Sequence, residues 1–152
     1  MRFEQNVEDE GQNTEFGDSV LLGSREGCRL LSGEEIELEL SDMDTPLIVD
    51  CFARWCGPCQ LMVPVMDEVA KTLGNRCRVV KFDTDEFPEM AEMLRVQGLP
   101  TLLFIGPTES VDGVVTDVRP KVFHRFEGAA PADHVLKLAD QYLFDGAQLP
   151  VA

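Results

Sequence analysis

A buried strand that leads almost directly into an amphipathic helix is the feature that most constrains this chain. Residues 47–53 (LIVDCFA) form a mostly apolar run bounded by Pro46, which is typical of a central strand covered on both faces. From about residue 58 to residue 73 the apolar side chains follow a helical period, and Gly74 closes that helix. A strand and a helix in this order predict a βα unit of an α/β domain.

The rest of the chain continues this alternation. We expect a strand over residues 77–82, a short helix over 87–96, strands over 101–105 and 122–126, and a last helix over 132–143. Before residue 47 the pattern is weaker. Either of two short apolar runs, 20–22 or 30–31, is a candidate first strand. Residues 33–41 fit a helix capped by Ser32 and Glu35 nearly as well as a strand. The order predicts an α/β fold with a central mixed β-sheet flanked by helices on both faces.

Shifts in composition divide the 152 residues into one domain with two tails. Residues 1–17 are polar and acidic and are predicted to form a mobile tail. We place the domain at residues 18–145 and a C-terminal tail at 146–152. Within the domain, about residues 106–121 exceed a tight hairpin turn by roughly ten residues, so we expect an inserted loop that is either mobile or a partner contact.

The charge of the chain excludes several classes of partner. Its 28 acidic and 13 basic residues give a net charge of −15, and the first 45 residues alone hold 13 acidic and 3 basic side chains. Such a surface disfavours nucleic acid and anionic lipid. The longest apolar stretches are about six residues, against the ~20 of a membrane span. The acidic N-terminus does not resemble a signal or transit peptide, so we expect that none exists or that it has been removed.

The chemistry is concentrated in Trp55-Cys56-Gly57-Pro58-Cys59, at the predicted strand-to-helix junction. Cysteines three apart in a first helical turn can bring their sulfur atoms within bonding range. The positive end of the helix favours a thiolate at Cys56, which lowers its pKa and makes it nucleophilic. Cys59, one turn further in and more buried, is expected to stay protonated and to react second.

Half of a zinc site is the competing interpretation of a C-x-x-C pair. Zinc sites usually need four ligands, but this chain has no second pair, and His124 and His134 lie far along the sequence. We therefore predict a redox motif and no metal ligand.

Three further cysteines make the total odd, which does not fit a secreted disulfide framework. Cys51 and Cys77 fall in predicted strands and are interpreted as small core residues. Cys28 falls in a loop-like stretch next to Gly27, where it is either inert or a third redox thiol.

Several separate segments, in the right order, resemble the thioredoxin family over about residues 45–143. They are VDCFARWCGPC at 49–59, Pro64 within the helix, VVKFDTD at 79–85, GLPT at 98–101 and FEG at 126–128. Residues 60–73 and 124–129 look most like the y-type thioredoxins of plastids, and the stretches TDEF and GLPTLLFI also resemble the plastid z-type. Phe52 stands where many relatives have tryptophan and Cys51 where phenylalanine is usual, but both changes keep an apolar residue. The resemblance implies a thioredoxin fold.

The resemblance also implies roles for the residues of the motif and its surroundings. Cys56 is the attacking cysteine, Cys59 is the resolving cysteine, and the two form a disulfide when oxidised. Asp50 matches a buried acid with a raised pKa that takes the proton of the resolving thiol through water, although it could merely cap a backbone group. Lys81 matches the lysine beside that acid, with a strand lysine that reaches solvent as the alternative.

The resemblance implies that a second group of residues contacts target proteins. Pro100, between Leu99 and Thr101, matches the family's cis-proline, next to which the backbone pairs with bound substrate, with an ordinary trans proline at the start of a strand as the alternative. Gly98 and Gly128 would allow a target chain to approach, although Gly128 is nearly as well explained as a turn glycine. The resemblance further implies that Trp55 shields the active site. It also implies that Gly57 and Pro58, between the two cysteines, favour a reductase over an oxidase or isomerase.

These implications predict a thioredoxin that reduces disulfides in target proteins without a cofactor. A separate reductase, ferredoxin-linked or NADPH-linked, would recharge it, and we expect a monomer. The subtype places it in the chloroplast stroma, with the cytoplasm as the alternative. Two rival functions are a thioredoxin-fold interaction subunit of a plastid assembly and a disulfide oxidase or isomerase.

Overall fold

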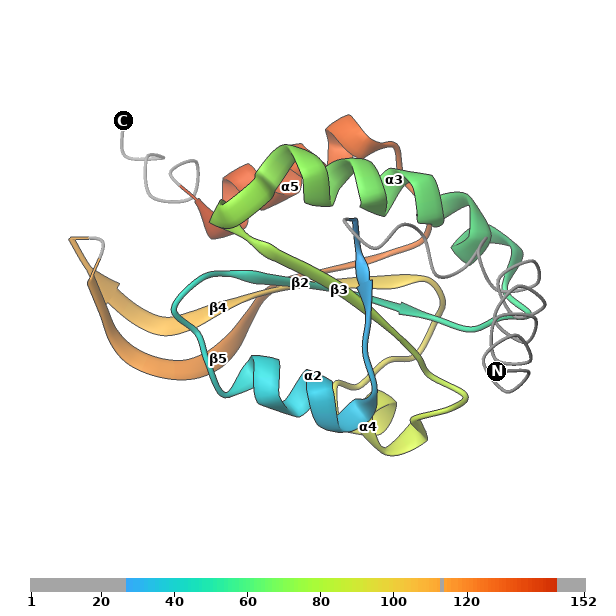
Figure 1. Ribbon diagram of the computed structural model, residues 1–152, viewed down its shortest axis with the longest axis horizontal. Coiled ribbons are helices and arrows are strands. Elements are labelled where there is room, and N and C mark those ends of the chain that lie inside the picture. The colour runs from blue at the N-terminus through green and yellow to red at the C-terminus, as the bar shows by residue number, and fades with distance from the viewer. Residues whose placement is uncertain (1–26, 113, 145–152) are drawn as a thin grey trace, which may run out of the picture.

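The structure, a computed structural model, describes residues 27–112 and 114–144 (Figure 1). The tails expected at residues 1–17 and 146–152 lie outside these ranges, as does the candidate strand at 20–22. Among the described helices, none is long and apolar enough to cross a bilayer.

A five-stranded mixed sheet runs through the molecule in the order β1-β3-β2-β4-β5 (Figure 1). The strands are β1 (Arg29–Leu30), β2 (Leu47–Phe52), β3 (Arg78–Asp83), β4 (Thr101–Val111) and β5 (Val114–Glu127). β1, β3 and β2 are parallel, whereas β4 is antiparallel to both β2 and β5. The sheet confirms the predicted mixed architecture, and every residue of β2 is buried, as expected of a central strand.

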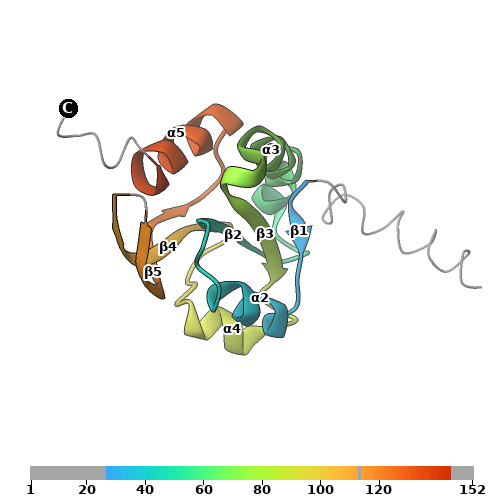
Figure 2. The same ribbon diagram turned by 60° about the vertical axis from the view of Figure 1, so that its left-hand side comes forward.

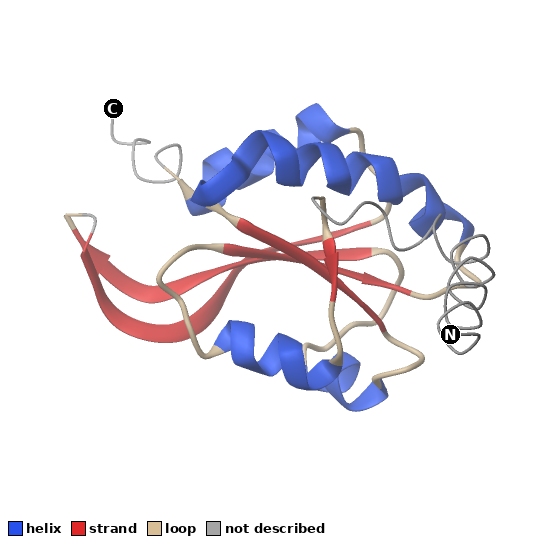
Figure 3. Ribbon diagram, in the orientation of Figure 1, coloured by secondary structure: helices blue, strands red, loops and turns tan. Residues whose placement is uncertain are grey.

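Helices cover both faces of the sheet, as predicted. α2 (Gly33–Leu40) and α4 (Pro88–Met93) lie on one face, and α3 (Gly57–Leu73) and α5 (Ala132–Leu143) on the other (Figures 2 and 3). A short 3-10 turn, η1 (Gly74–Arg76), follows α3.

The ambiguity at residues 33–41 is resolved in favour of a helix. A reciprocal capping box begins α2: the Glu35 N–H donates to Ser32 Oγ at 3.1 Å, and the Ser32 N–H donates to Glu35 Oε1 at 2.8 Å. Only Ile36 of α2 is fully buried and Leu38 is exposed, so the apolar alternation does not correspond to one strand face.

The two faces of the sheet have separate cores because alternate residues of a strand point to opposite sides. Towards α3 and α5 the buried residues include Ile48, Val79 and Phe104. Towards α2 and α4 they include Val49, Val80 and Leu103, among others.

The prediction of an inserted loop at about residues 106–121 is wrong, and the strands on either side of it are longer than predicted. β4 continues to Val111 and β5 begins at Val114, so the segment forms a long two-stranded hairpin that projects beyond the helices (Figure 1). Valines on both strands favour the extended conformation. Pro107 lies opposite Pro120, which fits a position where neither residue donates a hydrogen bond to its partner.

α4 is shorter than the predicted helix over residues 87–96. It ends at Met93, and Arg95 adopts a left-handed φ of 58°. Residues 94–96 therefore turn away towards β4.

Candidate functional site

The N-terminus of α3 carries the disulfide-forming pair. β2 ends at Phe52, and Cys56 caps α3 with an extended backbone and accepts a hydrogen bond at Sγ from the Cys59 N–H at 3.2 Å. Pro58 lies in the first turn, where its missing N–H costs nothing. Cys56 and Cys59 form a disulfide with a Cα–Cα distance of 5.3 Å. The two cysteines differ little in burial, at 3% and 1% exposed, so the expected difference in burial is absent from this oxidised form.

The loop that presents Cys56 is tied to the loop after β3. Phe52 O accepts from the Thr84 N–H at 2.8 Å and from Thr84 Oγ1 at 3.0 Å. Arg54 Nε lies 3.4 Å from Asp83 Oδ2. The sequence analysis did not predict these partners. The order of the strands could have indicated them, because β2 and β3 are parallel neighbours and the residues that follow them meet at one edge of the sheet.

Trp55 is held on the surface by the same loop. Its Nε1 donates to Asp85 Oδ2 at 2.7 Å, and the side chain is 71% exposed. Gly57 and Pro58 are exposed beside it, whereas Phe52, Ala53 and both cysteines form a small buried cluster. Trp55 therefore contributes a fixed aromatic surface next to the disulfide.

Asp50 is buried in the middle of β2, opposite Lys81 of β3 and Leu102 of β4. Only 2% of the residue is exposed, and Oδ1 has no hydrogen-bond partner among the described residues. Burial raises the pKa of Asp50 from 3.8 to about 7, and the positive charge of Lys81 acts in the opposite direction. The carboxyl group can therefore exchange a proton near neutral pH.

Lys81 does not reach solvent, so that alternative is wrong: the residue is 2% exposed and its Nζ lies 5.9 Å from the centre of the Phe52 ring. Burial lowers the pKa of Lys81, whereas the neighbouring Cys28, Asp50 and Asp67 raise it. The register of β2 and β3 brings Lys81 and Asp50 side by side, as the family pattern implies.

The remaining cysteines are buried and reduced. Cys28 lies in a bend just before β1, as the loop-like sequence predicts, but it is buried. It is 1% exposed, and its N–H donates to Asp67 Oδ1 at 2.9 Å. Burial is the main cause that raises the pKa of the Cys28 thiol, and the negative charge of the nearby Asp50 raises it further. Burial likewise raises the pKa of Cys51, and that of Cys77 to about 12. The structure therefore favours inert thiols at all three positions.

The Leu99–Pro100 peptide bond is cis. Pro100 O accepts from the Gly128 N–H at 2.9 Å, and Gly98 O accepts from the Thr101 hydroxyl. Gly128 has φ 106°, a conformation that favours glycine, so a turn explains this residue. A Cβ on Gly98 would make only an ordinary contact with Glu127, so no close approach within the domain requires that glycine.

An unpaired stretch of backbone lies beside the disulfide. Leu99 packs against the cluster that contains Cys56 and Cys59. Among the described residues, the N–H groups of residues 97–99 and the Leu99 carbonyl have no hydrogen-bond partner. Backbone groups are strong hydrogen-bonding groups, so this edge can accept another extended chain.

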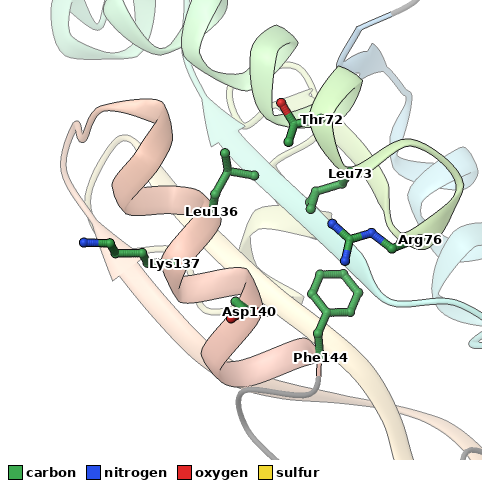
Figure 4. A pocket seen from close by; sticks show the side chains of 7 residues that line it. All are labelled: Thr72, Leu73, Arg76, Leu136, Lys137, Asp140 and Phe144. Carbon is green, nitrogen blue, oxygen red and sulfur yellow. The ribbon is translucent and has the colours of Figure 1, made fainter.

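Other polar features lie away from this site. His124 stacks on Tyr142 with ring centroids 4.1 Å apart, and His134 packs against Phe126. In the described ranges no three His, Cys, Asp or Glu side chains gather to hold a metal ion. A depression of about 250 Å³ lies between the C-terminal ends of α3 and α5, where the Arg76 guanidinium lies 4.9 Å from the centre of the Phe144 ring (Figure 4). It is at the opposite end of α3 from Cys56.

Comparison with known proteins agrees with this geometry. The sequence model of the family described as Thioredoxin matches residues 28–126. The chain belongs to the thioredoxin family. It is 39% identical to thioredoxin Y2, chloroplastic, of Arabidopsis thaliana over 104 residues, which is 68% of this chain and 55% of that protein. It is 42% identical to thioredoxin 1 of Nostoc sp. over 77 residues, 51% of this chain and 72% of that protein.

A solved structure of chloroplastic thioredoxin z has the same fold. It superposes with a TM-score of 0.63 and 37% sequence identity, covering 76% of this chain and 94% of that one. These findings confirm the family resemblance and the thioredoxin fold. The matched part of the chain spans about half the length of the plant Y-type proteins.

Proposed function

We propose that this thioredoxin-family protein reduces disulfide bonds in other proteins by dithiol–disulfide exchange. The observation that carries this proposal is the Cys56–Cys59 disulfide at the N-terminus of α3. Membership of the thioredoxin family supports the same reaction.

In the reduced protein, the Cys56 thiolate attacks one sulfur of a target disulfide and forms a mixed disulfide, while the other target sulfur leaves as a thiolate. The Cys59 N–H, which donates to Cys56 Sγ, and the positive end of α3 stabilise the attacking thiolate. Cys59 then attacks the Cys56 sulfur. The second target sulfur leaves as a thiolate, and the Cys56–Cys59 disulfide re-forms with two electrons passed to the target.

Asp50 is proposed to accept the proton that Cys59 loses in the second step. Its buried carboxyl has a pKa of about 7, so it is available as a base near neutral pH. Lys81, buried alongside, stabilises the ionised carboxylate. Water is expected to relay the proton.

The target chain is proposed to lie along residues 98–101 as an added strand. The Leu99 backbone beside the disulfide, which has no partner within the part of the chain that the structure describes, supports this arrangement. The exposed Trp55, Gly57 and Pro58 would line the other side of the bound chain. Gly128, whose N–H holds the Pro100 carbonyl, would border it near the end of β5.

Partners and location follow from the family. We propose that the targets are proteins with reducible disulfides and that a thioredoxin reductase, ferredoxin-linked or NADPH-linked, recharges a monomeric protein. Because the Y-type relatives are named chloroplastic, we propose the plastid stroma, with the cytoplasm as the alternative.

The test is dithiothreitol-driven reduction of insulin by the wild type, Cys56→Ser and Cys77→Ser. We expect acceleration by the wild type and by the Cys77 variant, whose cysteine is buried and reduced, but none by Cys56→Ser. A folded but inactive wild type would favour the interaction-subunit function, which a Cys56→Ser, Cys59→Ser double variant should then retain. A midpoint potential near the isomerase value of about −180 mV, rather than the thioredoxin value of about −270 mV, would favour the oxidase or isomerase.

A further inference from the structure

The end of α4 leaves two carbonyl groups for another element to satisfy. The Val96 N–H donates to Ala91 O at 2.9 Å and the Arg95 N–H to Glu92 O at 3.0 Å, around the left-handed Arg95. This is the usual double hydrogen bond of a helix C-terminus, although glycine is the common residue at the left-handed position. The carbonyls of Leu94 and Arg95 lie beyond this pattern.

Arg125 of β5 binds both of these carbonyls. Its Nη2 donates to Leu94 O at 2.8 Å and its Nη1 donates to Arg95 O at 3.1 Å. Among the described residues no carboxylate lies within ion-pair distance of Arg125. The planar guanidinium can present two donors to neighbouring acceptors in one fixed geometry, whereas a lysine ammonium is a single point charge.

β5 holds the other end of the same segment as well. Glu127 pairs with Thr101 in the β4–β5 ladder, and the Gly128 N–H donates to Pro100 O at 2.9 Å. The four residues 96–99, which include the unpaired backbone beside the disulfide, therefore run between two attachments made by one short stretch of chain.

We propose that Arg125 is a positioning residue for target proteins: it fixes the path of residues 96–99 so that their free backbone groups meet an extended target chain. This inference rests on the proposed reductase function and extends it to target recognition. The described hydrogen bonds of Arg125 go to Leu94 O and Arg95 O and not to Cys56 or Cys59. Its effect is therefore on target docking and not on thiol–disulfide exchange.

The test compares a protein disulfide with a small one. With insulin, Arg125→Ala is expected to raise KM about tenfold, because residues 96–99 are then no longer held in the path that pairs with the target chain. Arg125→Lys, whose ammonium keeps the charge and three donors but lacks the fixed fork that spans both carbonyls, should restore part of that loss. The rate with 5,5′-dithiobis(2-nitrobenzoate), which has no backbone to pair, and the midpoint potential should match those of the wild type.

Arg119→Ala is the matched control, because Arg119 also lies in β5 but binds Asp117 on the exposed hairpin. Circular dichroism and thermal unfolding check that each variant is folded. An unchanged KM for insulin in Arg125→Ala, or an equal loss with both substrates, would overturn the positioning role. If the wild type itself does not reduce insulin, the proposed function fails, and the positioning role that rests on it is withdrawn as well.

Discussion

The disulfide-bearing end of the molecule and the β4–β5 hairpin both expose apolar side chains, yet they differ in what lies behind them. Trp55 and Leu61 are exposed near the disulfide, and Val114 and Val118 on the hairpin. β2, the strand that leads to the disulfide, holds the buried carboxyl group of Asp50, and among the described residues the Leu99 backbone beside the disulfide cluster is unpaired. The outer part of the hairpin consists of paired strands with exposed charges. Exposed apolar surface alone therefore does not identify the reactive region.

One carboxyl group in each region makes the difference explicit. Burial raises the pKa of Asp50 to about 7. Hydrogen bonds from Arg119 lower the pKa of Asp117, on the hairpin surface, to about 2. Asp50 can take up and release a proton near neutral pH, whereas Asp117 remains ionised there. Desolvation, which only the interior supplies, is what brings the pKa of Asp50 close to neutral pH.

The largest contrast is expected for the cysteine pair. Cys59→Ser should trap the target on Cys56 as a long-lived mixed disulfide and reduce turnover to background, because no resolving thiol remains. Non-reducing gels and mass spectrometry of the adduct provide the measurement, with Val118→Ser on the hairpin as the control. A Cys59→Ser variant that turns over normally would contradict the assigned order of attack.

Substitutions at the two ends of the β4–β5 ladder should also differ in their effect on the free energy of unfolding. Phe104 is fully buried towards α3 and α5, so Phe104→Ala is expected to lower the free energy of unfolding by about 3–5 kcal/mol. Val118→Ala, on the exposed hairpin, should change it by less than about 0.5 kcal/mol. Urea denaturation measures both. Similar losses would mean that the hairpin is as important to stability as the inner ladder.

Asp50 should make stability depend on pH. Because the folded-state pKa is raised, folding favours the protonated form. The stability that Asp50 contributes is therefore fully present below its ordinary pKa and is lost as the pH rises through about 7. The loss attributable to Asp50 should reach about 3–4 kcal/mol. Urea denaturation between about pH 4 and about pH 8 should show this loss in the wild type and not in Asp50→Asn.

Asp117→Asn is the matched control for that experiment. The lowered pKa of Asp117 contributes stability that is lost only as the pH falls below the ordinary range of a carboxyl group. Its profile above about pH 5 should therefore follow the wild type. A wild-type profile that Asp50→Asn does not alter would contradict the raised pKa.

The smallest effect is expected from shortening the hairpin. Replacing residues 108–119 by an Asn-Gly turn leaves Pro107 and Pro120 in place, together with the inner ladder and the disulfide. Insulin reduction should stay within about twofold of the wild type, because no contact of the disulfide cluster is removed. A large rise in KM would assign the hairpin to target recognition.

Much of the site could be predicted because its signals are local. The apolar run of β2, the capping box of α2, the bounds of α5 and the cysteine pair of α3 each depend on neighbours within about one or two turns of chain. The cis bond before Pro100 followed from family resemblance and not from any local pattern. The hairpin was missed because its loop-like composition, with two prolines, obscured an extended pattern that pairing across the strands stabilises.

The sequence by itself determined where a redox-active pair sits, at the start of a helix that follows a buried strand. Only the tertiary structure decided that Asp50 and Lys81 lie side by side without access to solvent, and that Arg125 holds carbonyls 30 and 31 residues away. The reason is physical. Helix caps and turn geometry act between neighbours in sequence, whereas desolvation and strand register exist only after distant segments pack together.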